Sequence, residues 1–275
     1  MYNNTNRNII KKNYVSIIGT SFKNSELEVI KSLQGCLTQK YKFFEIIIVL
    51  PPYYNNLQVF KRHAYKNLKI LITPKKENLA KSLNVALGHT SGEFIARVDF
   101  DDVHCASKLL HQIKVFKKNK SIDVCGTNAL IKFKNEAFIK KLILPELHFD
   151  IKKFFFFFNA IAHPTVMFRK KEILKIKAYN NQFNYSEDLD LWLRSLKARF
   201  IFYNLQMELT HINQKNSKIR VAKNFLYNYK TRLNSSKKVY GIFFGTINIL
   251  FFYLFYRLSN NFKEKVKFFF YKKLI

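Results

Sequence analysis

Short apolar runs alternate with helical patterns along the first hundred or so residues, and this alternation constrains the fold more than any other feature. The runs are rich in β-branched side chains and stop at Gly, Pro or acidic residues. Strands alternating with helices at this spacing predict βαβ units and a mainly parallel sheet flanked by helices. The four expected strands are residues 15–18, 45–50, 68–72 and 93–98.

Helical periodicity lies between these runs. Apolar residues recur three and four positions apart at Leu27, Ile30, Leu33 and Leu37, which predicts a helix. A second helix is expected over residues 79–87. In open α/β sheets a ligand binds beyond the carboxyl ends of the strands, so the end of the fourth expected strand is a candidate site.

The pattern becomes less regular beyond Lys108. We expect a helix to about Lys118, strand-like runs near residues 124–126 and 166–168, and a helix over 189–196. We interpret residues 13–215 as one domain of two halves, divided after residue 107. The polar residues 1–13 predict no signal peptide, and three scattered cysteines (Cys36, Cys105, Cys125) are expected to be reduced.

A basic and aromatic C-terminal region follows, residues 216–275. The chain has a net charge of +30, and from Gln214 onward 14 Lys or Arg face the single acid Glu264. An uncharged apolar run of 18 residues covers 239–256. It could lie on a membrane surface, span the bilayer or pack on the preceding domain. The charge favours an anionic membrane surface as a partner, and we expect no nucleic-acid partner because no matching motif is present.

Two acidic groups carry the candidate chemistry. Asp99, Asp101 and Asp102 follow the fourth expected strand and repel one another unless a cation neutralises them. Their oxygen ligands suit Mn²⁺ or Mg²⁺, although a solvated turn capping the next helix explains them equally well. Glu187 and Asp188 precede Leu-Trp-Leu-Arg and suit either a helix N-terminus or a catalytic base.

An ordered set of motifs resembles the family 2 glycosyltransferases of the GT-A fold. The similarity covers about residues 13–212. The segments that carry it are 78–84 (Asn-Leu-Ala-Lys-Ser-Leu-Asn), 91–97 (Ser-Gly-Glu-Phe-Ile-Ala-Arg), 99–102 (Asp-Phe-Asp-Asp), 162–169 (Ala-His-Pro-Thr-Val-Met-Phe-Arg) and 187–194 (Glu-Asp-Leu-Asp-Leu-Trp-Leu-Arg).

The resemblance implies a GT-A catalytic domain over residues 13–215, with a nucleotide-sugar half at 13–107 and an acceptor half at 108–215, followed by an α-helical basic tail. Asp101 and Asp99 would hold Mn²⁺ or Mg²⁺. Asp188 would be the general base, and Glu187 would position it or bind the acceptor. His211 is either a third metal ligand or a surface histidine. The residues expected to contact the nucleotide-sugar are Thr20, Ser21, Asn78, Asn84, Arg97 and Asp99.

The implied activity is an inverting transfer of sugar from a nucleotide-sugar, UDP-linked by the family's habit, to a glycan or lipid-linked acceptor. The family resemblance implies bacterial surface-polysaccharide synthesis, such as lipopolysaccharide, O-antigen or capsule. We expect a cytoplasmic chain that is peripheral at the inner face of the cytoplasmic membrane, with a single C-terminal span as the alternative.

One position departs from the family pattern. Where the second strand normally ends in acids that hold uracil, this chain reads Leu-Pro-Pro-Tyr-Tyr over residues 50–54. Tyr53 or Tyr54 could stack on a base instead, or the nucleotide could differ. The missing acid also motivates an alternative function, a catalytically degenerate member that binds glycan or acts as a scaffold.

Overall fold

The four strands expected from the first half form the parallel part of one nine-stranded sheet, with β1 between β2 and β4 and with β3 beyond β2. The structure, a computed structural model, describes residues 10–62, 67–133, 139–214 and 218–257. The strands are β1 (Lys11–Thr20), β2 (Phe44–Leu50), β3 (Leu68–Ile72) and β4 (Gly92–Asp99).

Three helices connect these strands. Ser25 begins α1 (Glu26–Leu37) with a capping box, in which its side chain accepts from the Glu28 N–H and the Glu28 carboxylate accepts from the Ser25 N–H. Asn78 caps α3 (Leu79–Gly88), a helix expected from the sequence. The short α2 (Leu57–Arg62) was not expected.

The second half turns the parallel sheet into a mixed one. The sheet order is β3-β2-β1-β4-β8-β6-β9-β5, and β7 pairs with β6 outside this path. β8 is antiparallel to both β4 and β6, whereas β9 runs parallel to β6. The added strands are β5 (Val103–His104), β6 (Ile122–Phe133), β7 (Ile139–Leu142), β8 (Met167–Arg169) and β9 (Ile201–Gln214).

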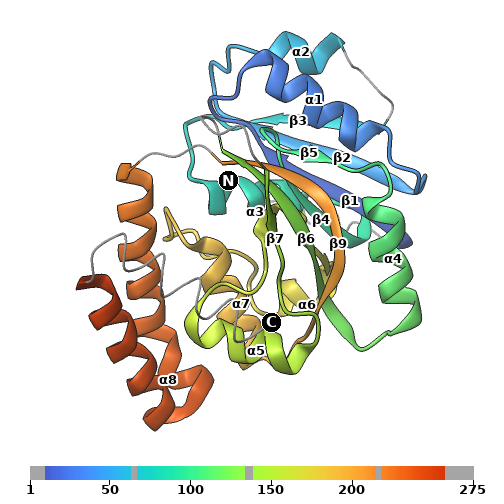
Figure 1. The fold of residues 1–275 in the computed structure, drawn as a ribbon. Coiled ribbons are helices and arrows are strands. Elements are labelled where there is room, and N and C mark those ends of the chain that lie inside the picture. The colour runs from blue at the N-terminus through green and yellow to red at the C-terminus, as the bar shows by residue number, and fades with distance from the viewer. Residues whose placement is uncertain (1–9, 63–66, 134–138, 215–217, 258–275) are drawn as a thin grey trace.

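Helices cover both faces of this sheet, as expected (Figure 1). Alternation along the strands separates two cores: Ile17 packs with α1, α2 and α4, and Ile18 packs with α3, α5, α6 and α7. The helices of the second half are α4 (Lys108–Lys118), α5 (His148–Phe157), the 3₁₀ turn η1 (His163–Thr165), α6 (Lys170–Lys175) and α7 (Glu187–Lys197). All three cysteines are free, which confirms that they form no disulfide.

The C-terminal helix α8 (Lys218–Arg257) folds back on itself at Gly241, where φ is 82°. We call residues 218–257 the α8 hairpin. Its segment Tyr227–Phe255 is long and apolar enough to cross a membrane by length and composition alone.

The hairpin packs on the catalytic domain, which is one of the three alternatives that the sequence left open for the apolar run. Rings of Phe156, Phe157 and Phe158 in and after α5 lie edge-to-face against rings of Tyr240, Phe251 and Phe255 in α8. Figure 1 shows α8 as two neighbouring arms at the edge of the molecule. The last part of the basic and aromatic region, residues 258–275, lies outside the described residues.

Candidate active site

Strand alternation builds the acidic turn at the end of β4. Phe100 is buried and its ring packs edge-to-face on Phe60, so the carboxylates on either side of it are directed out of the core. Asp99 pairs with Thr20 across the β1–β4 ladder, which places the buried Thr20 and Ser21 beside the turn. The expected meeting of strand ends at one sheet edge is therefore present.

Three carboxylates share this turn. Oxygens of Asp99, Asp101 and Asp102 all lie within 4.8 Å of one another. Asp102 is buried and accepts a hydrogen bond from the Asn213 N–H at 2.9 Å, and the Asn213 side chain donates to the Asp101 carbonyl. Burial and the negative charges of Asp99 and Asp101 raise the pKa of Asp102 well above its ordinary value.

This donor set fits a hard divalent cation. The chemistry is all oxygen, and the mutual repulsion that raises the pKa of Asp102 is the interaction that a bound cation would relieve. Within the described part of the chain, the group close enough to share one ion consists of these three aspartates alone. His211 lies exposed on β9, opposite Val103, and its assignment as a ligand stays a prediction.

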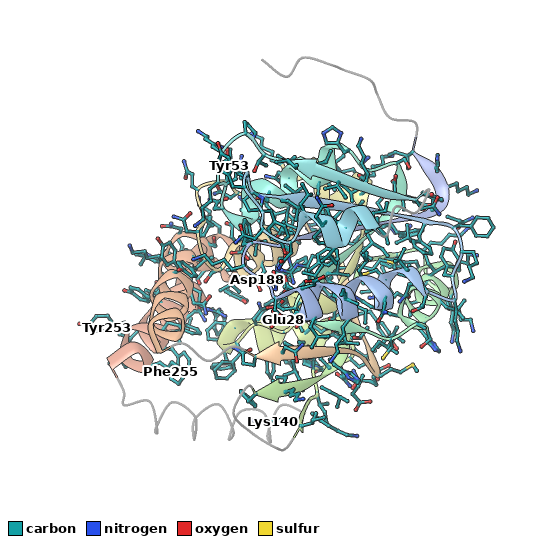
Figure 2. The ribbon with its side chains drawn as sticks, turned by 90° about the horizontal axis from the view of Figure 1, so that it is seen from above. Glu28, Tyr53, Lys140, Asp188, Tyr253 and Phe255 are labelled. Carbon is teal, nitrogen blue, oxygen red and sulfur yellow. The ribbon has the colours of Figure 1, made fainter. Side chains whose placement is uncertain are left out.

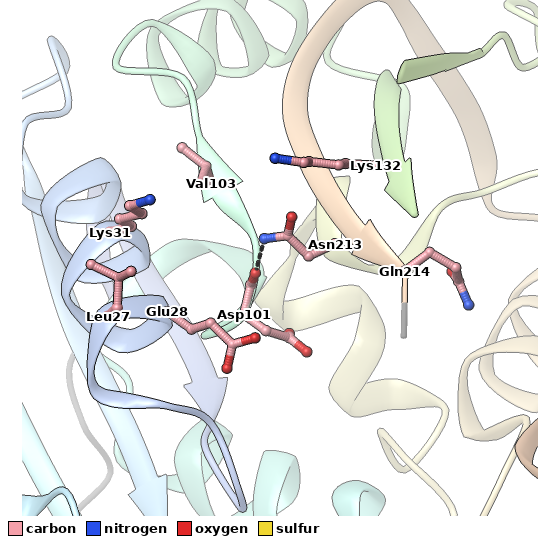
Figure 3. A pocket seen from close by; sticks show the side chains of 8 residues that line it. All are labelled: Leu27, Glu28, Lys31, Asp101, Val103, Lys132, Asn213 and Gln214. Carbon is pink, nitrogen blue, oxygen red and sulfur yellow. Dashed lines mark hydrogen bonds between the residues drawn. The ribbon is translucent and has the colours of Figure 1, made fainter. Parts of the chain in front are cut away.

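A cavity of about 300 Å³ adjoins the turn, between α1 and β9. Figure 3 shows the side chains of Glu28 and Asp101 next to each other in the cavity wall, with Lys31 and Lys132 farther along. None of Glu28, Lys31, Lys132 and Asn213 was singled out from the sequence. Glu28 is explained locally by its capping box, and the other three come close to Asp101 only through tertiary folding.

Arg97 connects the acidic turn to the second acidic group. It is 2% exposed, and its two terminal nitrogens donate to the two carboxylate oxygens of Asp99, each at 2.5 Å. Its positive charge also lowers the pKa of Glu187 and of Asp188. The Arg97 N–H donates to the Val166 carbonyl at 3.0 Å, next to η1, whose His163 lies 4.0 Å from Glu187. These contacts join the two carboxylate groups, which are almost ninety residues apart in the sequence.

The second acidic group begins α7. Ser186 precedes the helix in a left-handed conformation, with φ 60°, an uncommon backbone state for a residue other than glycine. Its hydroxyl donates to the Asn228 side-chain oxygen of α8 at 2.5 Å. The helix N-terminus offers unpaired N–H groups to the carboxylates that follow.

Glu187 and Asp188 sit in different surroundings. Glu187 is buried, with its carboxylate 4.0 Å from Nδ1 of His163. Burial and the adjacent Asp188 raise the pKa of Glu187 to about 7. Asp188 is half-buried and accepts a hydrogen bond from the Asn159 amide at 2.7 Å. Burial raises the pKa of Asp188, and the Asn159 hydrogen bond lowers it.

His163 and Tyr179 support this pair from behind. Nε2 of His163 lies 2.9 Å from the Tyr179 hydroxyl, and both side chains are buried. Burial and the charge of Arg97 hold the pKa of His163 well below its ordinary value, so the ring is neutral at pH 7. Asn159 and Tyr179 carried no sequence signal, because each belongs to a segment without a recognisable motif.

The two expected asparagines of α3 bind the protein's own backbone. Asn78 donates to the Asn181 carbonyl at 2.8 Å, and Asn84 donates to the Tyr179 carbonyl at 2.7 Å. Both therefore hold the loop that leads to the second acidic group. Their direct contact with a nucleotide-sugar stays a prediction, as does the role of Thr20 and Ser21.

The two tyrosines after β2 have different environments. Tyr54 packs on Phe60, and its hydroxyl lies 2.5 Å from the Ser21 hydroxyl. Tyr53 is 98% exposed and has φ 59°. In Figure 2 Tyr53 lies near the rim and Asp188 toward the middle of the molecule. Of the two candidates for stacking on a base, Tyr54 adjoins the expected site residue Ser21 and Tyr53 presents a free ring face.

Comparisons with known proteins agree with this geometry. The family model described as glycosyl transferase family 2 matches residues 17–176, ending before the second acidic group. An uncharacterized glycosyltransferase of Methanocaldococcus jannaschii is 28% identical over 80% of this chain and 78% of its own. The O-antigen biosynthesis glycosyltransferase WbnJ of Escherichia coli is 36% identical over 60% of this chain and 65% of its own.

A solved structure has the same fold. The crystal structure of residues 1–349 of Staphylococcus aureus TarS in complex with UDP-GlcNAc superposes with a TM-score of 0.65, at 18% identity, over 81% of this chain and 67% of that one. The central sheet with its flanking helices is therefore of the GT-A type. Because the family model covers more than half of the sequence, this chain belongs to glycosyl transferase family 2.

Proposed function

We propose that the chain is an inverting glycosyltransferase that uses a divalent cation, Mn²⁺ or Mg²⁺, and a nucleotide-sugar donor. The observation that carries this proposal is the position of Arg97. Its side chain donates to Asp99, and its backbone N–H donates to Val166, next to η1, whose His163 lies 4.0 Å from Glu187. Arg97 thereby links the carboxylates proposed to hold the cation with the carboxylate pair that contains the proposed base. Membership of the family supports the reaction class.

In this proposal Asp101 and Asp99 hold the cation, which would stabilise the negative charge that develops on the departing nucleoside diphosphate. Arg97 fixes the Asp99 carboxylate through two parallel hydrogen bonds. Because Arg97 is buried, its side chain has little room to move, and this keeps the Asp99 carboxylate in a fixed position.

Asp188 is the proposed general base. Its half-exposed carboxylate can reach an acceptor hydroxyl, and the Asn159 amide orients it. As the acceptor oxygen forms its bond to the anomeric carbon, the hydroxyl proton passes to Asp188 and the bond to the diphosphate oxygen breaks. A single displacement of this kind inverts the anomeric configuration. Glu187 is buried beside a neutral His163, which suits positioning better than proton transfer.

The proposed donor is a UDP-sugar and the proposed acceptor a glycan or lipid-linked glycan of a surface polysaccharide. The relative named for O-antigen biosynthesis supports the pathway class, and the UDP-GlcNAc complex of TarS supports a nucleotide-sugar of that kind. Residues 50–54 contain no acid for uracil, and the nearby Ser21 hydroxyl is hydrogen-bonded to Asn24 and Tyr54, so the donor screen has to include other nucleotides. We place the enzyme at the inner face of the cytoplasmic membrane, where such acceptors are carried.

The test is nucleoside diphosphate release from UDP-, GDP- and dTDP-sugars by purified protein with membrane extract, with and without Mn²⁺ or Mg²⁺. We expect release with at least one donor and its loss in EDTA. Asp188→Asn should lower kcat by roughly three orders of magnitude or more while calorimetry still detects donor binding.

Asp150→Asn is the matched control, since this exposed carboxylate of α5 is paired only with Lys153 and lies outside the site. It should keep full activity. Turnover retained in Asp188→Asn would reject the base assignment. Donor binding without release in any condition would instead favour a catalytically inactive glycan-binding protein.

A further inference from the structure

Besides its aromatic packing, the inner face of the α8 hairpin is fixed to the preceding domain by buried polar side chains. The buried Ser236 and Asn248 hydrogen-bond across the two arms at 2.6 Å. Arg232 donates to the Phe155 carbonyl at 2.6 Å, and Asn248 donates to the Phe156 carbonyl. These carbonyls belong to the last turn of α5, where a helix leaves its acceptors unpaired. The hairpin is therefore anchored through the end of α5.

The outer face of the second arm is apolar. Gly245 and Asn248 are buried, whereas large apolar side chains on the opposite face are open to solvent. The exposed residues are Ile242 (79%), Phe243 (71%), Phe244 (59%), Ile247 (42%), Leu250 (55%) and Leu254 (55%). A helix on a water-soluble protein buries its apolar stripe, whereas this arm buries Phe252 and Phe255 and leaves these six large apolar side chains in solvent. A contiguous apolar surface of this kind marks an interaction site.

Charge identifies the partner. Residues 218–257 contain eight Lys or Arg and no Asp or Glu. Lys230, Lys237 and Lys238 are exposed on the first arm. A cavity of about 450 Å³ between α7 and α8 is lined by Lys197, Lys230 and Lys238 and by a single acid, Asp190, which is paired with Arg194. Cations beside an apolar face match the phosphates and acyl chains of anionic lipid.

We propose that the outer face of the α8 hairpin is a docking surface for an anionic membrane and lies in the plane of the headgroup–acyl boundary. The turn at Gly241 and the hydrogen bonds that hold both arms to the end of α5 favour an in-plane hairpin over a span. Tyr253, which Figure 2 shows at the outer edge of the hairpin, is 40% exposed and is of a residue type suited to the membrane interface.

The docking surface is coupled to the proposed base. On the first arm, Asn228 accepts the Ser186 hydrogen bond, and the ring of Tyr227 lies 5.2 Å from that of Tyr185. Both contacts are immediately before Glu187. Membrane docking would therefore fix the direction in which the active site faces the bilayer. This orientation rests on the proposed function, whereas membrane binding itself does not.

The experiment is flotation of the full chain with phosphatidylglycerol vesicles and with phosphatidylcholine vesicles, in the absence of any sugar donor. We expect binding to phosphatidylglycerol that weakens with salt, and much less binding to phosphatidylcholine. Leu250→Glu combined with Leu254→Glu should lower the partition coefficient about tenfold or more. The matched control is Leu147→Glu with Leu174→Glu, which adds the same charge at leucines that are 58% and 47% exposed outside the hairpin.

Equal loss of binding in both double variants would overturn the proposal, because net charge alone would then explain it. Unchanged binding in the Leu250/Leu254 variant would also overturn it. A third outcome would overturn the proposal as well: light scattering shows that the full chain is a dimer, and the Leu250/Leu254 variant is a monomer that still binds vesicles. A second copy of the chain would then cover this face. Thermal melts of each variant check folding. Vesicle binding without nucleoside diphosphate release rejects the proposed function and leaves the docking surface standing.

Discussion

Arg97 is the residue on which the site depends most. Its planar guanidinium matches the two oxygens of Asp99, and the pair is held at 2.5 Å with Arg97 almost fully buried. Lys could not replace it without losing one of the two parallel hydrogen bonds. The family resemblance implied that Arg97 contacts the donor, whereas its terminal nitrogens are directed to a neighbouring carboxylate. The Arg97 side chain therefore positions the Asp99 carboxylate, in addition to any contact that it makes with the donor.

At the same scale, Asn159 tunes the proposed base. Asn159→Leu removes the hydrogen bond that favours the ionised form of Asp188, so the pKa of Asp188 should rise further. We expect the acidic limb of the pH profile of kcat/KM to move to higher pH. Asn119→Leu, at an exposed asparagine after α4, is the control and should leave the profile in place. A general loss of activity with an unmoved limb would contradict the assignment.

Among the elements, the α8 hairpin depends on two glycines that its sequence alone made hard to interpret. Gly241 takes a positive φ at the turn. Gly245 lies where the two arms meet, and a Cβ there would come within 2.5 Å of the Lys237 Cα. In the sequence both residues only weakened the case for a membrane span. In the fold they permit the turn and the close approach of the arms.

Gly245→Val should therefore push the arms apart and destabilise the protein by about 1–3 kcal/mol, because the clash is with backbone atoms that cannot rotate away. Urea unfolding measures the free energy of unfolding. Gly88→Ala in α3 is the control, since nothing lies within 4 Å of the added Cβ, and it should cost nothing. Equal stability of Gly245→Val and wild type would argue against the packed hairpin.

At the scale of the whole molecule, the buried Glu187 carboxyl group makes the stability of the protein depend on pH. Glu187 holds its proton to higher pH in the native state than in the unfolded chain, because its pKa is raised from 4.5 to about 7. Between these values the native state binds more protons, so the contribution of Glu187 to stability falls as pH rises through this window. Above pH 7 the site retains a buried, ionised carboxylate beside Asp188.

Glu187→Gln should raise the melting temperature of the metal-free protein at pH 8 by a few degrees and change it little near pH 4.5, since the amide carries no charge to bury. Scanning calorimetry in EDTA follows this difference across pH. The control Glu172→Gln removes a partly exposed carboxylate paired with Lys175 and should change the melting temperature at pH 8 much less. A stability gain largest at low pH would reverse the sign and refute the explanation.

Buried histidines act in the opposite direction. Burial lowers the pKa of His104 and of His163 well below its ordinary value. The unfolded chain therefore binds more protons than the native state below about pH 6.5, and this part of the stability is lost as pH falls. The two effects oppose each other between about pH 4.5 and 6.5, so Glu187→Gln should also sharpen the acid denaturation of the protein.

The sequence by itself determined the first half of the sheet. Residues 68–72 and 108–118 match β3 and α4 in full, and the runs at 45–50 and 93–98 fall inside β2 and β4. Local periodicity and the Gly, Pro and Asn residues between the elements carry this information, because β2 and β4 are apolar runs buried on both faces and the helices are buried on one. The acidic turn was also recognisable, since three carboxylates in four residues follow directly after a buried strand.

Only the tertiary structure decided how these parts combine. β9 was missed because its alternation is interrupted, and its partners β5 and β6 lie far from it along the chain. Asn213 and Asn159 meet their aspartates across 111 and 29 positions. The apolar C-terminal run was open to three interpretations until the Gly241 turn and the Arg232 contact with α5 fixed one face of it on the domain. A local sequence pattern indicates which residues are buried. It does not specify which distant segments those residues contact, because such contacts form only in the folded chain.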